Sequence, residues 1–235
     1  VVPDNNFENY LEANSMGDGI PLNDTILIQN VYLVTMLNVD NLNISELTGV
    51  EGFTSLENLS CKNNNLDSLD VSDNLNLITL DCSTNQILNL DLRDNTSLET
   101  IDCSNNQLST LDVSDNSNLI ELACHDNIFS SLDLRNGNNI NMPNNNFDVI
   151  NNSQLNCIDV DDSTWSVNNW INIDLQHFFG LNCPGGYGCT ALSALNYDST
   201  ATIDDGNCAY PQTFIPDVAF EAYLESIGLG NDILG

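Results

Sequence analysis

The chain has 235 residues, of which 34 are acidic and only 3 are basic, so its formal net charge at pH 7 is -31. A polyanion of this kind repels nucleic acid and anionic membrane surfaces, and we expect neither as a partner. No apolar run is long enough for direct membrane insertion, whereas an apolar content of 41% suffices for a folded core. The sequence starts at Val1 without a signal peptide, which indicates a mature or excised piece of a longer protein.

Residues 1–35 predict a helical cap at the N-terminal end of the fold. The stretch "VPDNNFENYLEAN" has the pattern of a short amphipathic helix. Asp4 is the expected N-cap residue, because an aspartate side chain accepts hydrogen bonds from the first free backbone N–H groups of a helix. Phe7, Tyr10 and Leu11 share one apolar face, which would cover the start of the next domain.

Residues 36–150 contain an internal repeat of 21 residues. The segment "LSCKNNNLDSLDVSDN", which begins at Leu59, returns as "LDCSTNQILNLDLRDN" at Leu80, "IDCSNNQLSTLDVSDN" at Ile101 and "LACHDNIFSSLDLRNG" at Leu122. A strict period without a helical 3.6-residue pattern predicts a solenoid, in which each lap is one coil and the coils stack at about 4.8 Å. Every lap repeats a cysteine (Cys61, Cys82, Cys103, Cys124) and an asparagine (Asn64, Asn85, Asn106, Asn127).

The repeated cysteines are expected to be small residues of the core. Alternate residues of an extended segment point to the same face, so Leu59 and Cys61 point inward while Ser60 points to solvent. Disulfide or metal roles are disfavoured, because in-register side chains on parallel strands point the same way and His125 should point away from Cys124. We therefore expect buried free thiols. The repeated asparagine is expected to turn each corner and to bond to backbone groups that the strand ladder leaves unpaired.

Aspartates occupy outward positions in the same laps. One set lies in the second half of the lap, and a shorter set lies in the first half: Asp70, Asp91, Asp112 and Asp133, and then Asp81 and Asp102. Like charges about 4.8 Å apart repel by roughly 0.9 kcal/mol in a water-like dielectric. Two interpretations stand: a solvated face that keeps the protein soluble, or a binding surface for cations and cationic partners. On the second interpretation, divalent cations should raise the melting temperature.

The repeat "LxxLxCxxNxLxxLDVSxN" resembles the 21-residue leucine-rich repeat of bacterial proteins, the class called IRREKO. The resemblance covers residues 1–183, including "ISELTGVEGFTSL" at residues 44–56. It implies a leucine-rich-repeat solenoid that is mainly β, with a short helical N-terminal cap, a C-terminal cap and a parallel strand on the concave side of a short arc or flattened coil. Similar proteins are commonly exported by type IX secretion and are associated with adhesion at the cell surface.

Residues 151–183 predict a C-terminal cap closed by a disulfide. Cys157 and Cys183 enclose four large aromatic residues, Trp165, Trp170, Phe178 and Phe179. The aromatic residues are expected to form a hydrophobic lid over the last coil, and a platform for stacking sugars is the alternative. A Cys157–Cys183 disulfide would tie the lid shut and would require an oxidising compartment.

Residues 184–211 have the character of a connector. The segment "GCTALSALNYDSTATIDDGNC" resembles the motif "GCTDPxAxNYDPxATxDDGSC", which lies between modules of large secreted bacterial proteins and is regarded as calcium-binding-like. The resemblance implies a Cys189–Cys208 disulfide and a calcium site. Its candidate oxygen ligands are Asn196, Asp198, Asp204, Asp205 and Asn207. Ala191 stands where the motif has an aspartate, so a disulfide-closed turn without metal stays open as the alternative.

Residues 212–235 begin a second copy of the N-terminal cap. The stretch "IPDVAFEAYLES" repeats "VPDNNFENYLEA" at the start of the chain. We infer an array of modules that runs through cap, coils, lid and connector and then starts again.

The sequence shows no enzyme motif. HExxH, GxSxG and P-loop patterns are absent, and the two histidines, His125 and His177, lie in different modules. We expect a non-catalytic binding module for adhesion or recognition, secreted or on the bacterial cell surface, within a larger multi-module protein. Its partners would be a protein or glycan ligand or neighbouring modules of the same chain, and calcium is the cofactor that the connector suggests. The alternative is a structural spacer or stalk whose repeats set the length of a surface protein.

Overall fold

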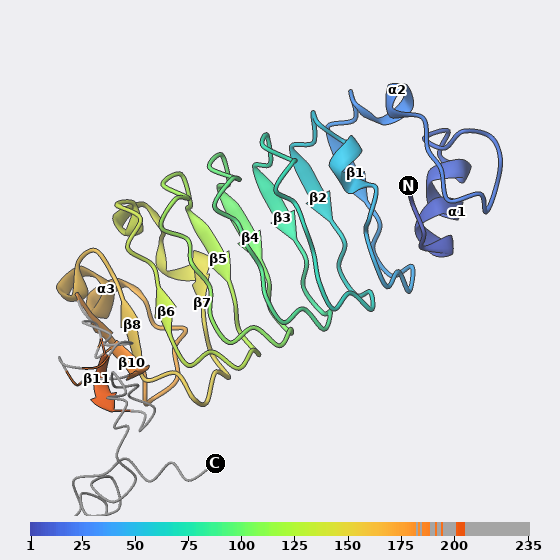
Figure 1. The fold of residues 1–235 in the computed structure, drawn as a ribbon. Helices are drawn as coiled ribbons and strands as arrows, with labels where there is room; N and C mark the ends of the chain where they lie inside the picture. Colours follow the sequence, from blue (N-terminus) through green and yellow to red (C-terminus); the bar gives the residue numbers. More distant parts are fainter. Residues whose placement is uncertain (182, 184, 189–190, 192–193, 195–200, 205–235) are drawn as a thin grey trace, which may run out of the picture. The chain divides into compact units, whose positions relative to one another are not determined.

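The computed structural model describes residues 1–181, 183, 185–188, 191, 194 and 201–204. The chain divides into two compact units, Val1–Cys183 and Pro184–Gly235. The first unit is a stack of coils that follow one another along a single axis (Figure 1). No helix among the described residues is long and apolar enough to cross a membrane.

The first half of each coil contributes a short strand to a six-stranded parallel sheet, called sheet A here. In spatial order its strands are β1 (Met36–Asn38), β2 (Asn58–Ser60), β3 (Thr79–Asp81), β4 (Thr100–Asp102), β5 (Glu121–Ala123) and β7 (Phe147–Asp148). Leu59 pairs with Leu80, and Leu80 with Ile101, so the 21-residue period becomes a step of one strand. The step from β5 to β7 is longer, and its additional residues include the 3-10 helices η2 (Asn139–Asn141) and η3 (Asn144–Asn146).

The second half of the coil forms sheet B, which has three parallel strands. They are β6 (Leu132–Asp133), β8 (Cys157–Asp159) and β9 (Phe178–Gly180). Both halves bury their apolar rows in one core: Leu80 and Cys82 come from the first half, and Leu90 and Leu92 come from the second. Because both rows point inward, the residues that alternate with them face solvent on opposite sides of a flattened coil.

The four repeated cysteines line one buried column, as the sequence predicts. Cys61, Cys82, Cys103 and Cys124 are free thiols with 0% exposure. Burial raises the pKa of each thiol well above its ordinary value, because the apolar core disfavours the thiolate. The cysteines are therefore packing residues.

The repeated asparagines tie successive coils together. Asn106 accepts the N–H of Ile87 at 2.9 Å and donates to the carbonyl oxygens of Cys82 and Cys103 at 3.1 Å each. Because Cys82 belongs to the preceding coil, the side chain joins two coils, which confirms the predicted corner role. The residue before each corner asparagine has a positive φ, namely Asn63, Thr84, Asn105, Asp126 and Asn151.

The N-terminal cap contains two helices, α1 (Asn5–Ala13) and α2 (Ile28–Val31), and the 3-10 helix η1 (Val50–Gly52) follows in the first coil. As predicted, Asp4 caps α1: its Oδ1 accepts the N–H groups of Asn6 and Phe7 at 2.9 and 3.0 Å. Its Oδ2 accepts the N–H of Ser45 at 2.8 Å, which joins the helix to the first coil. Phe7 is fully buried, so the helix closes the core with its apolar face.

The C-terminal cap is a lid of packed aromatic residues together with helix α3 (Ser163–Asn169). Trp170 is 1% exposed, and its ring centroid lies 4.3 Å from that of Phe147 and 5.6 Å from that of Phe179. Its indole N–H donates to the carbonyl oxygen of Met142 at 2.9 Å.

Trp165 is partly buried against the core, with its ring centroid 5.6 Å from that of Trp170. Phe178 differs from the prediction, because its side chain is 51% exposed and does not belong to the buried core. The lid therefore consists of Trp165, Trp170 and Phe179, and the buried Trp170 offers no open ring face to a sugar. The predicted Cys157–Cys183 disulfide is present.

In the second unit the structure describes one pair of parallel strands, β10 (Gly185–Gly188) and β11 (Ala201–Asp204). The second copy of the cap, predicted for residues 212–235, lies outside the described residues.

Candidate functional site

The outward side of the second half-laps carries a row of aspartates, called the ladder face here. Asp112 forms a bridge with Asp133, and Asp133 pairs with Asp159 in the adjacent strand. The row therefore comprises Asp70, Asp91, Asp112, Asp133 and Asp159. Sequence reasoning missed Asp159, because the irregular coil after Gly137 breaks the 21-residue period. The local pattern "IDV" at residues 158–160, which matches "LDV" at residues 69–71, is the signal that would have found it.

Two of the six aspartates predicted to form one binding surface lie on a different side. Asp81 and Asp102 are paired in β3 and β4 of sheet A, whereas Asp70, Asp91, Asp112 and Asp133 alternate with the buried residues of the opposite half of the coil. A single ligand surface therefore contains one set or the other.

Each aspartate also has a local structural role. The carboxylate of Asp70 accepts the N–H of Ser72, two residues on, at 3.0 Å, and Asp112 accepts that of Ser114 at the same distance. Asp91, Asp133, Asp81 and Asp102 make the same bond to the second following residue. Such a bond forms a local turn that ends the extended segment. The pattern Asp-x-Ser or Asp-x-Arg in the sequence is the signal for this turn.

Arginines of the same chain neutralise part of the ladder face. Arg93 forms a fork with Asp91, in which Nη2 lies 2.6 Å from Oδ2 and Nε lies 3.0 Å from Oδ1. Its hydrogen bonds lower the pKa of Asp91 to about 2. Arg135 holds Asp133 in the same way, at 2.6 and 2.9 Å, and also lies 4.0 Å from Asp159. On the sheet A side, Lys62 lies 3.9 Å from Asp81. All three basic residues of the sequence therefore form ion pairs with aspartates of these two rows.

Three shallow hollows follow one another along the ladder face. The first has a volume of about 400 Å³ and shares Asn89 with the second, which shares Leu111 and Asp112 with the third. The volumes of the second and third are about 280 and 360 Å³. These volumes lie near the lower end of the roughly 300–1,000 Å³ that small-molecule pockets occupy, and each hollow has room for one long side chain. Together they form a trough that runs across the coils.

Comparison with solved structures identifies the type of solenoid. The chain is similar to the functional domain of InlJ from Listeria monocytogenes, which includes a cysteine ladder, with 27% sequence identity and a TM-score of 0.57 over 76% of this chain and 45% of that chain. The fold is a leucine-rich-repeat solenoid.

Two further likenesses of the leucine-rich-repeat solenoid are more distant. The internalin InlF from Listeria monocytogenes has 18% identity and a TM-score of 0.47, over 76% of this chain and 56% of that chain. The LRR protein LIC12759 from Leptospira interrogans has 19% identity and a TM-score of 0.36, over 60% of this chain and 38% of that chain. The chain spans about half the length of the InlJ and InlF structures. No protein-family model and no curated protein matches the sequence.

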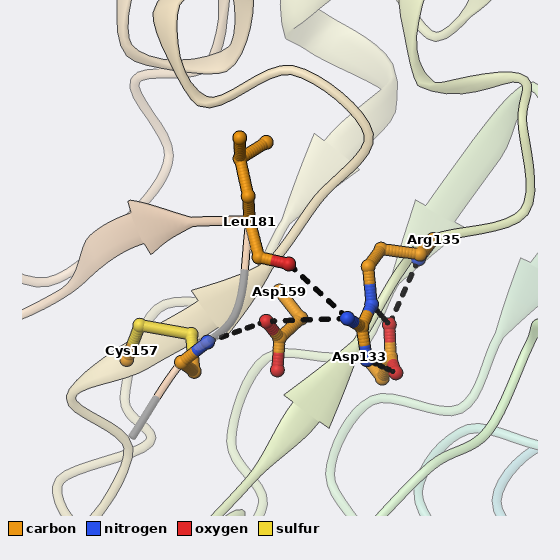
Figure 2. The surroundings of a disulfide bond; sticks show 6 residues. Asp133, Arg135, Cys157, Asp159 and Leu181 are labelled. Atoms are coloured by element: carbon orange, nitrogen blue, oxygen red, sulfur yellow. Dashed lines mark hydrogen bonds and ion pairs between the residues drawn. A yellow bond between two sulfur atoms is a disulfide. The ribbon is translucent and has the colours of Figure 1, made fainter. Parts of the chain in front are cut away.

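At the C-terminal end of the leucine-rich-repeat solenoid, the ladder face meets the disulfide (Figure 2). Asp159 accepts the N–H of Cys183 at 2.6 Å, and Arg135 donates to the carbonyl oxygen of Leu181 at 3.1 Å. Gly180 occupies the next position of the row. A Cβ atom there would lie 3.1 Å from Sγ of Cys157, so an aspartate at this position would crowd the disulfide. Arg135 and Asp159 thus join the ladder face to the lid.

The predicted calcium site lies mostly outside the described residues. Asp204 is the last residue of β11, while the other candidate ligands, Asn196, Asp198, Asp205 and Asn207, and both cysteines of the expected second disulfide, Cys189 and Cys208, are not described. Among the residues that are described, no group of three or more His, Cys, Asp or Glu side chains could hold a metal ion. Calcium in the connector therefore stays a prediction.

Proposed function

We propose that this chain is a non-catalytic binding module for adhesion or recognition, within a larger multi-module bacterial protein that is secreted or displayed on the cell surface. The observation that carries the proposal is the trough of the ladder face, where side chains of identical spacing are held on a stack of coils. The side-chain hydrogen bonds of the corner asparagines fix successive coils to one another. A ligand would therefore bind a surface that is already ordered. The trough suits an extended protein segment more than a compact small molecule.

The chemistry of the described residues supports a non-catalytic role. The buried thiols have raised pKa values and do not reach solvent, so they supply no nucleophile. His125 bonds to its neighbour Asp126 at 2.7 Å, and the buried His177 bonds to backbone groups of the lid. Neither histidine activates a serine or a cysteine in the described part of the chain.

The structural roles of the cap residues support the array of modules. Asp4 caps α1, Glu8 accepts the N–H groups of Asn23 and Asp24 at 2.8 and 3.1 Å, and Glu12 accepts that of Asp18 at 2.8 Å. All three acidic residues recur in the tail of the sequence, together with the buried Phe7 and Leu11: Asp217, Phe220, Glu221, Leu224 and Glu225. The tail thus carries the side chains that build the first cap. The disulfide of the lid supports an oxidising, extracellular location, and type IX secretion is the export route that we propose.

A binding screen on the complete chain tests the proposal. A random peptide display library and a glycan array are probed with the wild type and with a variant that carries Asp70→Asn, Asp91→Asn and Asp112→Asn. Asparagine keeps the oxygen that accepts the turn N–H, so the variant is expected to fold, which a thermal melt checks. Peptides enriched on the wild type should bind the variant about tenfold more weakly or worse, because charge-assisted bonds are lost. If neither library yields a ligand, the binding module is overturned.

A structural spacer is the second candidate, and one observation favours it. Every aspartate of the ladder face is used in a local turn of its own coil, apart from Asp159, which holds the lid. The row can therefore exist for folding and solubility without any ligand. A spacer should also repeat its outward residues in the next module, whereas a recognition surface should vary them, so the sequence beyond Gly235 separates the two candidates.

A further inference from the structure

We propose that the first hollow of the ladder face, around Asp70, is a subsite for the guanidinium group of an arginine side chain in a protein ligand. The subsite presupposes the binding function proposed above and names the chemical group that this end of the trough receives.

The chain itself shows what such a carboxylate binds. Coils alternate between serine and arginine two residues after the ladder aspartate, at Ser72, Arg93, Ser114 and Arg135. Where arginine is present, its guanidinium forms two parallel bonds to the aspartate, at 2.6 and 3.0 Å for Arg93 and at 2.6 and 2.9 Å for Arg135. Fork geometry of this kind is the strongest arrangement that an exposed carboxylate makes with a cation.

Asp70 and Asp112 are the aspartates of the repeated laps that no described arginine holds in a fork, and Asp70 is the one whose hollow has no basic residue in its lining. Its Oδ1 accepts the N–H and the hydroxyl of Ser72 at 3.0 and 2.7 Å, while its Oδ2 has no partner among the described residues. The hydrogen bonds to Asp91 raise the pKa of the Arg93 guanidinium most, and the charge of Asp112 adds to this effect. Arg93 lines the second hollow together with Asp91 and Asp112, whereas the hollow around Asp70 has no basic residue in its lining.

The first hollow has the shape and the charge for an arginine. Glu46, Glu51 and Asp73 bring three further carboxylates to it, and Leu47 and Leu69 supply apolar walls. No basic residue lines it, whereas Arg93 lines the second hollow and Arg135 is bonded to Asp133 of the third. Its volume of about 400 Å³ accepts one long side chain. An arginine would lay its methylene stem on the leucines and direct its fork at Asp70.

Chemical-shift mapping with a matched peptide pair tests the subsite. The probes are Ac-Gly-Thr-Arg-Thr-Gly-NH2 and the same peptide with citrulline, which has the shape of arginine without its charge. The arginine peptide should shift the backbone amides of residues 46–51 and 68–73 of the ¹⁵N-labelled chain. The citrulline peptide should bind at least about fivefold more weakly, because a charge-assisted bond is lost. Equal binding of the two peptides overturns the guanidinium subsite.

Three variants sharpen the test. Ser72→Arg supplies the guanidinium from within, as Arg93 and Arg135 do in their own coils, and Asp70→Asn removes the charge. Both should weaken the arginine peptide by about fivefold or more, while the matched control Ser114→Arg, at the other serine coil, should change its affinity by less than about twofold. If the arginine peptide shifts amides of the trough but binds Ser72→Arg and Asp70→Asn as tightly as the wild type, the guanidinium subsite is contradicted. Binding by the ladder face would still be supported. If no shift appears up to about 10 mM peptide, the subsite falls, and the library screen still decides the wider function.

Discussion

At the scale of the residue, two sets of asparagines look alike in the sequence and differ in the structure. Asn106 uses both ends of its amide, since its oxygen accepts from Ile87 and its nitrogen donates to carbonyl oxygens. Asn95, at the other corner of the coil, donates to Val71 and Asn74 at 2.9 and 3.0 Å, while its buried oxygen has no partner among the described residues. A buried polar atom without a partner costs free energy, so the second corner is the weaker one.

We predict that Asn106→Ala destabilises the chain more than Asn95→Ala does. The first substitution leaves a buried N–H and several carbonyl oxygens unpaired, which should cost about 2–4 kcal/mol, whereas the second also removes an unpaired oxygen and should cost about 1–2 kcal/mol. Urea unfolding of both variants measures the free energies. Equal losses would contradict the different bonding of the two corners.

Thr84 is the one β-branched residue at the positive-φ position of the corners. Its φ is 58°, and the corresponding residues are Asn63, Asn105, Asp126 and Asn151, which tolerate this backbone better. We predict that Thr84→Asn stabilises the chain by about 0.5–1 kcal/mol. The reverse change, Asn105→Thr, is the matched control and should destabilise by a similar amount in the same unfolding experiment. A neutral result for both would show that the corner relaxes around threonine.

At the scale of the element, the coil is a unit with interchangeable surface chemistry. Four successive coils end their second half with a turn on an aspartate, and they differ in whether serine or arginine stands two residues later. The core positions stay apolar and the corner asparagine of the first half-lap is kept across these coils, so the outward positions can vary without a change of fold. This separation is what a recognition surface requires.

We predict that Arg93→Ser raises the pKa of Asp91 from about 2 toward its ordinary value. A carboxylate with a lowered pKa in the folded state stabilises that state above its unfolded pKa of about 3.9. This stabilisation is lost as the pH falls through the folded value, so the wild type should lose it between about pH 4 and pH 2. Carboxyl ¹³C NMR titration measures the shift. Asp70, whose turn residue is Ser72, is the internal control and should keep its pKa in the variant.

At the scale of the whole molecule, the stack is closed by two different caps. The N-terminal cap seals the core with an amphipathic helix that Asp4 bonds to the first coil. The C-terminal cap packs Trp170 on the last coil and adds a covalent tie between Cys157 and Cys183. A strand at the end of a sheet offers unpaired backbone groups to other chains, so both caps protect the stack from end-to-end association.

We predict that replacing Cys157 and Cys183 together with alanine destabilises the lid. The bridge spans a sequence separation of 26 residues, for which loop-closure entropy gives about 3.5 kcal/mol. Guanidinium unfolding measures the loss, and hydrogen exchange should show that the amides of residues 170–181 open before those of sheet A. Reducing agent should reproduce the effect in the wild type and leave the lid of the double variant unchanged. Uniform loss of protection along the stack would contradict a local role.

The sequence by itself determined the coil. A 21-residue period corresponds to a step of one strand, and alternation within it places cysteine and leucine inward and aspartate outward. The solenoid, the buried thiols, the asparagine corners and the Asp4 cap were therefore all predictable. Each is a local consequence of spacing or of a side chain that bonds to nearby backbone. The paired cysteines around the aromatic residues likewise predicted the lid and its disulfide.

Only the tertiary structure decided how the aspartates are distributed and paired. The period cannot show that Asp81 and Asp70 face opposite sides, because that depends on how the two halves of the coil close around one core. It also cannot bring Asp159 into the ladder across an irregular coil, or place Arg135 between two rungs and the carbonyl of Leu181. These contacts join residues that are far apart in the chain, and the distances between them arise from the stacking of coils.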